Sequence, residues 1–168
     1  VQTCALPILW GKLALADAQY APALAAFKAG LKSAPNNLDL LSGAGIASDL
    51  MSQHVDARNY YNQALSNNRA ADLSAVRTNL GMSYLLSHEP KLAVAILKTE
   101  AKKPAASPTT RHNLALAYGA LGNDKEARSL LKNELSEPER LAAVARLRQY
   151  WVARTPDTNP LKPSVHVK

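Results

Sequence analysis

Three residues at fixed offsets recur four times along the chain. In each set a small residue is followed 12 residues later by alanine, and 4 residues after that by a bulky apolar residue. Corresponding members recur after 34, 36 and 34 residues, an interval typical of arrays in which each repeat is a pair of helices. The four sets are Gly11, Ala23 and Phe27; Gly45, Ala57 and Tyr61; Gly81, Ala93 and Leu97; and Ala115, Ala127 and Leu131.

The residue types in these sets suit the crossing of two antiparallel helices. Small side chains at the first two positions let the helices approach closely, and the third residue fills the space beside the crossing. A larger residue at Gly45 or Ala57 would overpack this contact, at a cost of about 1 to 3 kcal/mol. The sets therefore predict packing positions.

From about residue 9 to residue 137 the chain resembles the tetratricopeptide repeat (TPR) family. The resemblance implies an all-α solenoid of about four helix pairs, the first one truncated, plus a C-terminal capping helix. We expect one superhelical domain over residues 9–153 and a flexible tail over 154–168, where three prolines occur. Because the matching residues are packing residues, they indicate a fold and not a function.

Prolines and capping residues divide the chain into nine expected helices. Pro35 ends one helix, Asn36 or Asn37 can cap the next, and Ser107 precedes a proline suited to a first helical turn. Gly122 ends another helix. The expected ranges are 9–16, 21–32, 38–51, 55–66, 73–87, 90–102, 108–121, 124–135 and 137–153.

The last of these ranges has the pattern of a capping helix, which covers the apolar face of a final repeat. Leu141, Val144 and Trp151 fall on one stripe, so we expect Trp151 in the core. Arg140 and Arg148 project near the same stripe. Their aliphatic stems must then lie along apolar surface while their charges reach water.

Residues 1–8 read as the in-frame translation of a sequencing-library adapter, so we interpret them as an artefact. On this interpretation the native N-terminal segment, with any signal peptide or lipid-anchor cysteine, is missing. Cys4 then carries no argument about disulfides or compartment.

Charge and hydropathy exclude two classes of partner. The formal net charge is +7, but lysines and arginines are scattered, and Lys102 and Lys103 are the only adjacent pair. We therefore expect a solvated basic surface and no nucleic-acid binding. No apolar run reaches the length of about 18 residues needed to span a membrane, so any membrane attachment would need the missing lipid anchor.

Catalytic and metal-binding patterns are also lacking in the sequence. His54, His88, His112 and His166 lie far apart, and none has a histidine or cysteine partner at helical spacing. There is no phosphate-binding glycine loop and no nucleophile motif. We expect no enzyme activity, no cofactor and no metal.

Function must then reside in a surface. By resemblance, the first helix of each pair lines a concave groove that binds an extended segment of a protein partner. Asn79 and Asn113 occupy the same groove position one period apart, and a side-chain amide can pair with peptide backbone. The alternative is that these asparagines bond only to a neighbouring helix. The expected groove residues are Ile46, Asp49, Leu50, Thr78, Asn79, Met82, Leu85, Leu86, His112, Asn113 and Leu116.

Residues 111–151 carry a narrower resemblance. The segment from Arg111 to Leu131, followed by a helix ending in Gln149-Tyr150-Trp151, is similar to the C-terminal part of TadD proteins of the tight-adherence (Flp) pilus machinery. This resemblance implies a periplasm-facing, outer-membrane lipoprotein that assists assembly of a pilus or secretin component. The alternative is a cytoplasmic TPR adaptor, scaffold or co-chaperone of an unrelated pathway. Oligomeric state stays open.

Overall fold

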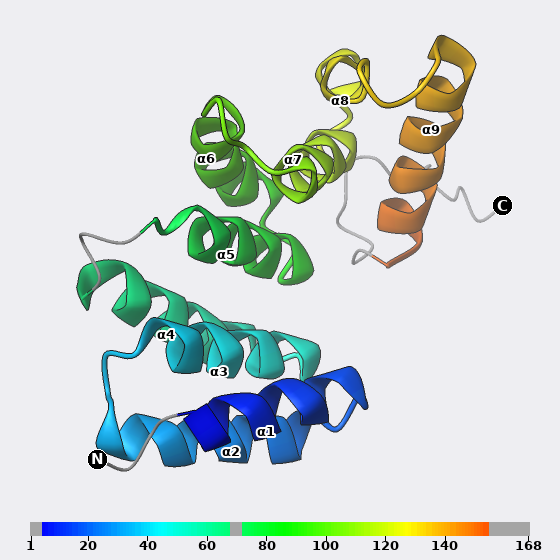
Figure 1. Ribbon diagram of the computed structural model, residues 1–168. Helices are drawn as coiled ribbons and strands as arrows, with labels where there is room; N and C mark the ends of the chain where they lie inside the picture. Colours follow the sequence, from blue (N-terminus) through cyan, green and yellow to red (C-terminus); the bar gives the residue numbers. More distant parts are fainter. Residues whose placement is uncertain (1–4, 68–71, 155–168) are drawn as a thin grey trace, which may run out of the picture. The chain divides into compact units, whose positions relative to one another are not determined.

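The computed structural model describes residues 5–67 and 72–154, and within them the secondary structure is helical without a strand. Figure 1 shows the helices in chain order. The expected tail from residue 155 onward and the first four residues of the expected artefact lie outside the described residues. The helices are α1 (Ala5–Ala16), α2 (Tyr20–Ser33), α3 (Leu38–Leu50), α4 (His54–Asn67), α5 (Ser74–Leu86), α6 (Pro90–Ala101), α7 (Pro108–Ala120), α8 (Asp124–Leu130) and α9 (Glu137–Arg154).

The chain divides into two compact units, one ending at Ser87 and the other beginning at His88. The N-terminal unit holds α1 to α5, and the C-terminal unit holds α6 to α9. Of the third recurring set, Gly81 belongs to the first unit, whereas Ala93 and Leu97 belong to the second. The expectation of one domain over residues 9–153 stays a prediction.

The core of the N-terminal unit confirms the close helix crossings that the first two sets predict. A Cβ atom added to Gly11 would lie 2.5 Å from Cε1 of Phe27, and one added to Gly43 would lie equally close to the same ring atom. The Phe27 ring therefore fills the space between α1 and α3. In the second repeat, a Cβ atom on Gly45 would lie 2.4 Å from Cε1 of Tyr61.

In the C-terminal unit, the fourth set forms a core together with the capping helix. Ala115, Ala127 and Leu131 are buried with Val144 of α9. The prediction of Trp151 as a core residue is confirmed, because it is 7% exposed and its ring meets His88 edge-on, with ring centroids 5.4 Å apart. Helix α9 packs mainly on α7 and less on α8.

One turn conformation recurs between the two helices of a repeat. Seven residues after the first small residue of each set, the backbone has a positive φ. Gly122 adopts it at 77°, without the steric cost that a side chain brings. The N–H of Asn123 donates to the carbonyl of Tyr118 at 2.9 Å, as in a Schellman motif. The corresponding residues in the earlier repeats are Ala18, Ser52 and His88.

Three helix boundaries differ from those expected. Helix α1 begins at Ala5 and not at residue 9, with Pro7 in its first turn, where a proline is tolerated. Arg154, expected in the tail, is the last residue of α9. Helix α8 ends at Leu130 and not at residue 135, because Arg140 donates to the backbone carbonyls of Lys132 and Leu135 and so satisfies them outside a helix.

Candidate functional site

The expected groove residues differ widely in exposure. Asp49, Thr78 and Leu85 are buried. Leu50 and Leu86, which hold the same position in successive repeats, are 47% and 41% exposed. The side chains of intermediate exposure, together with the exposed His112, remain accessible to a partner; the intermediate ones are Ile46, Asn79, Met82, Asn113 and Leu116.

Asp49 lies at the centre of a buried hydrogen-bond network that joins three helices of the N-terminal unit. Its Oδ1 accepts a hydrogen bond from Ser83 Oγ of α5 at 2.8 Å and lies 2.9 Å from Nδ1 of His54. Its Oδ2 accepts from the hydroxyl of Tyr61 at 3.0 Å. These partners satisfy a carboxylate that is only 9% exposed. We call Asp49, His54, Tyr61 and Ser83 the Asp49 network.

The Asp49 network also changes the acidity of Tyr61. Burial raises the pKa of the Tyr61 hydroxyl well above its ordinary value of 10.0, and the neighbouring Asp49 carboxylate raises it further. Tyr61 therefore stays protonated and keeps donating to Asp49. This network was missed by the sequence reasoning, although a hydroxyl on the bulky third residue of one set alone was a signal that a buried partner was needed.

Two other expected groove residues have local structural roles. Thr78 Oγ1 donates to the carbonyl of Ser74 one turn earlier on α5, at 2.9 Å. Leu85 is 1% exposed and belongs to the core. Neither side chain is positioned for a partner in this arrangement.

In the C-terminal unit, three expected groove residues line one hollow of about 360 Å³, which we call the groove pocket. His112, Asn113 and Leu116 come from α7. Leu131 and Leu135 add apolar surface from the turn region after α8. The remaining lining residues are Ala115 of α7 and Ala143 and Arg146 of α9.

Glu134 holds the rim of the groove pocket in place. Its Oε2 lies 2.5 Å from Nε2 of His112, and its Oε1 is 3.3 Å from the guanidinium of Arg111. The hydrogen bond from His112 is the main cause that lowers the pKa of the Glu134 carboxyl, and Arg111 lowers it further. Arg111 is itself tied to the carbonyl of Ala106 at 2.8 Å, so the rim has a fixed orientation.

Asn113 and Arg146 are the polar groups that the groove pocket offers to a ligand. Within the described residues, neither side chain has a hydrogen-bond or ion-pair partner. The Asn113 amide supplies one acceptor and two donors, and the Arg146 guanidinium supplies donors and a positive charge. Leu116 and Leu135 give the pocket an apolar lining beside them. This combination suits a peptide with an apolar side chain.

Metal and membrane sites were also sought among the described residues. No group of three or more His, Cys, Asp or Glu side chains there is arranged to hold a metal ion. No described helix has the length and apolar character needed to cross a bilayer. The expected absence of catalysis and of cofactors stays a prediction.

The fold is similar to that of solved TPR proteins, although no protein-family model and no curated protein matches the sequence. YrrB, described as a TPR protein with an unusual peptide-binding site, superposes with a TM-score of 0.64 at 17% identity, over 88% of this chain and 77% of YrrB. MamA gives 0.62 at 17% identity, over 89% and 79%. A TPR protein from Parabacteroides merdae gives 0.68 at 18%, over 90% and 60%. The chain therefore has the tetratricopeptide repeat fold, with a C-terminal capping helix.

Proposed function

We propose that this chain is a non-catalytic protein-interaction module that binds an extended segment of a partner protein in the groove pocket. The observation that carries the proposal is the convergence of His112, Asn113 and Leu116 with Arg146 around one apolar hollow. The similarity in fold to YrrB, whose description includes a peptide-binding site, supports the same class of ligand.

The lining of the groove pocket defines how such a segment binds. The Asn113 amide pairs with the N–H and carbonyl of one peptide unit, which makes the contact independent of sequence. An apolar side chain of the ligand enters between Leu116 and Leu135 and leaves water. Arg146 binds a carbonyl or carboxylate of the ligand.

In the N-terminal unit, the accessible groove residues on α3 and α5 extend the proposal. Asn79 holds the same repeat position as Asn113, and the flexible side chain of Met82 lies one turn further along α5. Met82 supplies adaptable apolar contact. We propose that Ile46, Leu50, Asn79, Met82 and Leu86 contact the same class of ligand.

Selection of peptides from a displayed random library, followed by calorimetric titration of the best binder, tests this function. We expect peptides with an apolar residue and a nearby acidic residue. The variant Asn113→Ala should weaken binding about tenfold, the loss expected for one good pair of hydrogen bonds. Lys98→Gln, an exposed change on α6 outside the pocket, is the matched control. Undiminished affinity in Asn113→Ala and in Leu116→Glu would contradict the proposal.

The resemblance of residues 111–151 to TadD proteins supports a narrower proposal. In it, the chain is part of a periplasm-facing, outer-membrane lipoprotein that assists assembly of the Flp pilus and binds a pilus or secretin component. The competing proposal is a cytoplasmic adaptor, scaffold or co-chaperone of the same fold. The two proposals share the groove pocket and differ in compartment and partner.

An independent read of the genomic region distinguishes these two proposals. A signal segment with a lipid-anchor cysteine upstream, beside genes for pilus secretion, is the result expected for the pilus helper. A cytosolic start with unrelated neighbouring genes would contradict the pilus helper and favour the adaptor.

A further inference from the structure

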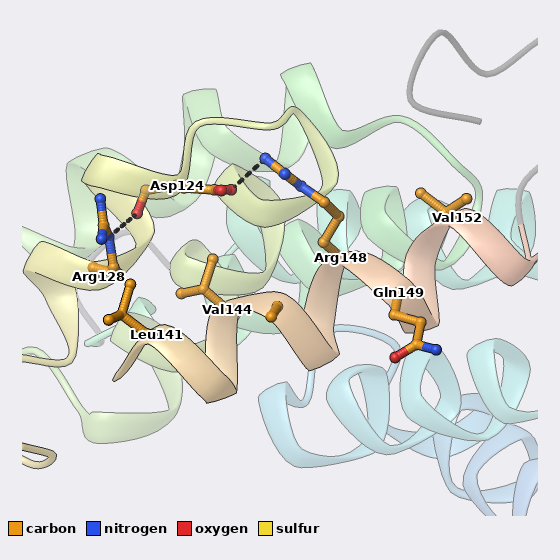
Figure 2. A pocket seen from close by; sticks show the side chains of 8 residues that line it. Asp124, Arg128, Leu141, Val144, Arg148, Gln149 and Val152 are labelled. Carbon is orange, nitrogen blue, oxygen red and sulfur yellow. Dashed lines mark hydrogen bonds and ion pairs between the residues drawn. The ribbon is translucent and has the colours of Figure 1, made fainter. Parts of the chain in front are cut away.

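A second hollow of about 410 Å³ lies on the C-terminal unit between α8 and α9, and we call it the α8–α9 cleft. Figure 2 shows Leu141, Val144 and Val152 of α9 directed into it, with Asp124 and Arg128 of α8 opposite. Arg146, which lines the groove pocket, does not line this cleft. The two sites therefore have separate polar groups.

The floor of the α8–α9 cleft is an apolar stripe along α9. Leu141, Val144, Ala145 and Val152 are spaced so that they follow one side of the helix. Leu141 is 48% exposed, so part of this stripe meets water. Eleven residues of α9 separate Leu141 from Val152, and at about 1.5 Å per residue the stripe is about three helical turns long.

Arg148 bridges the cleft and retains an unused donor. One guanidinium nitrogen donates to Asp124 Oδ1 at 2.6 Å and to the carbonyl of Gly122 at 3.3 Å, as Figure 2 shows for Asp124. Its Nε is buried and has no hydrogen-bond partner among the described residues. A buried N–H without an acceptor is costly, so an acceptor supplied by a ligand would be stabilised there.

The charges around the cleft favour an acidic ligand. Arg128 donates to the backbone carbonyl of Asp124 and lies 3.9 Å from Glu137, which also pairs with Arg140. Arg128, Arg140 and Arg148 thus share two carboxylates, those of Asp124 and Glu137. One positive charge of this group is left without a carboxylate of its own.

We propose that the α8–α9 cleft binds an acidic amphipathic helix of a partner protein. Apolar side chains at i, i+3 and i+7 of that helix lie along the stripe from Leu141 to Val152, which is the helix-in-groove mode of recognition. A glutamate or aspartate beside them accepts from Arg148 Nε and balances the unmatched positive charge. This site is independent of peptide binding in the groove pocket.

Nuclear magnetic resonance titration of the full 168-residue chain tests the proposal. The probe is a capped, alanine-based helical peptide of about 15 residues, with leucines at i, i+3 and i+7 and glutamates flanking them. The matched control peptide has lysines in place of the glutamates. We expect the acidic peptide alone to shift amide signals of α8 and α9.

Variants of the chain locate the binding. Arg148→Gln should weaken binding of the acidic peptide about tenfold through loss of the charged hydrogen bond. Leu141→Glu, at an exposed position that does not disturb folding, should weaken it by a similar factor. Lys132→Gln removes an exposed cation outside the cleft and should leave binding unchanged. Circular dichroism of each variant checks that the fold is retained.

Four results would overturn the proposal. These are no shifts with the acidic peptide, equal binding of the basic peptide, full affinity in both Arg148→Gln and Leu141→Glu, or shifts that depend on protein concentration without peptide. The last result would mean that a second copy of the chain occupies the cleft. Groove-pocket binding is read separately through Asn113→Ala, so failure of one site leaves the other testable.

Discussion

At the scale of single residues, the structure separates two kinds of polar side chain at equivalent repeat positions. Asp49 is buried because His54, Tyr61 and Ser83 supply donors to its carboxylate. Asn113 stays at the surface of a hollow because α9 places only apolar residues and Arg146 beside it. The same position in a repeat can thus stabilise the fold or offer a contact, depending on the neighbouring helix.

The Asp49 network leads to a prediction about alkaline stability. The pKa of Tyr61 is raised in the folded chain, so above the ordinary value of 10.0 the unfolded chain releases a proton that the folded chain keeps. Stability from this group is therefore complete below pH 10 and falls as the pH rises further. Tyr61→Phe should lower the free energy of unfolding by about 1 kcal/mol at neutral pH, through loss of one hydrogen bond.

Urea denaturation of the wild-type chain and of Tyr61→Phe, across pH 7 to about 11, measures this effect. The gap between the two chains should narrow above pH 10, by up to about 1.4 kcal/mol per pH unit. A gap that does not change with pH would show that Tyr61 is not held protonated by its surroundings.

At the scale of helices and turns, the sequence predicts the order of the elements well. Small residues at fixed offsets, prolines and capping residues are local signals, and they give nine helices whose ranges mostly overlap the observed ones within the described residues. The end of α8 was wrong by five residues, because the side chain of Arg140 binds the carbonyls there. Local patterns cannot anticipate a contact from a residue later in the chain.

The recurring turn gives a prediction about stability at this scale. Gly122→Ala places a side chain at a φ of 77° and should destabilise the chain by about 1 kcal/mol. Ser52→Gly removes a side chain from a φ of 60° and should be neutral or stabilising. Thermal denaturation of the two variants measures both effects. Equal midpoints for Gly122→Ala and the wild type would contradict this account of the turn.

At the scale of the whole chain, two compact units each carry part of the expected binding surface. Repeat register alone placed His112, Asn113 and Leu116 in one site, since it depends only on spacing. Arg146 could not be predicted as part of that site, because its position depends on how α9 packs against α7. The burial of Asp49 escaped prediction for the same reason, since its partners come from two other helices.

The most direct test of the central claim is amide-resolved nuclear magnetic resonance mapping of the full chain with a selected groove peptide. Our account predicts that the largest shifts centre on residues 112–116 and 143–146, and that Asn113→Ala and Arg146→Gln reduce them at equal peptide concentration. Shifts confined to residues outside the groove pocket, or unchanged shifts in both variants, would contradict the claim that this pocket is the binding site.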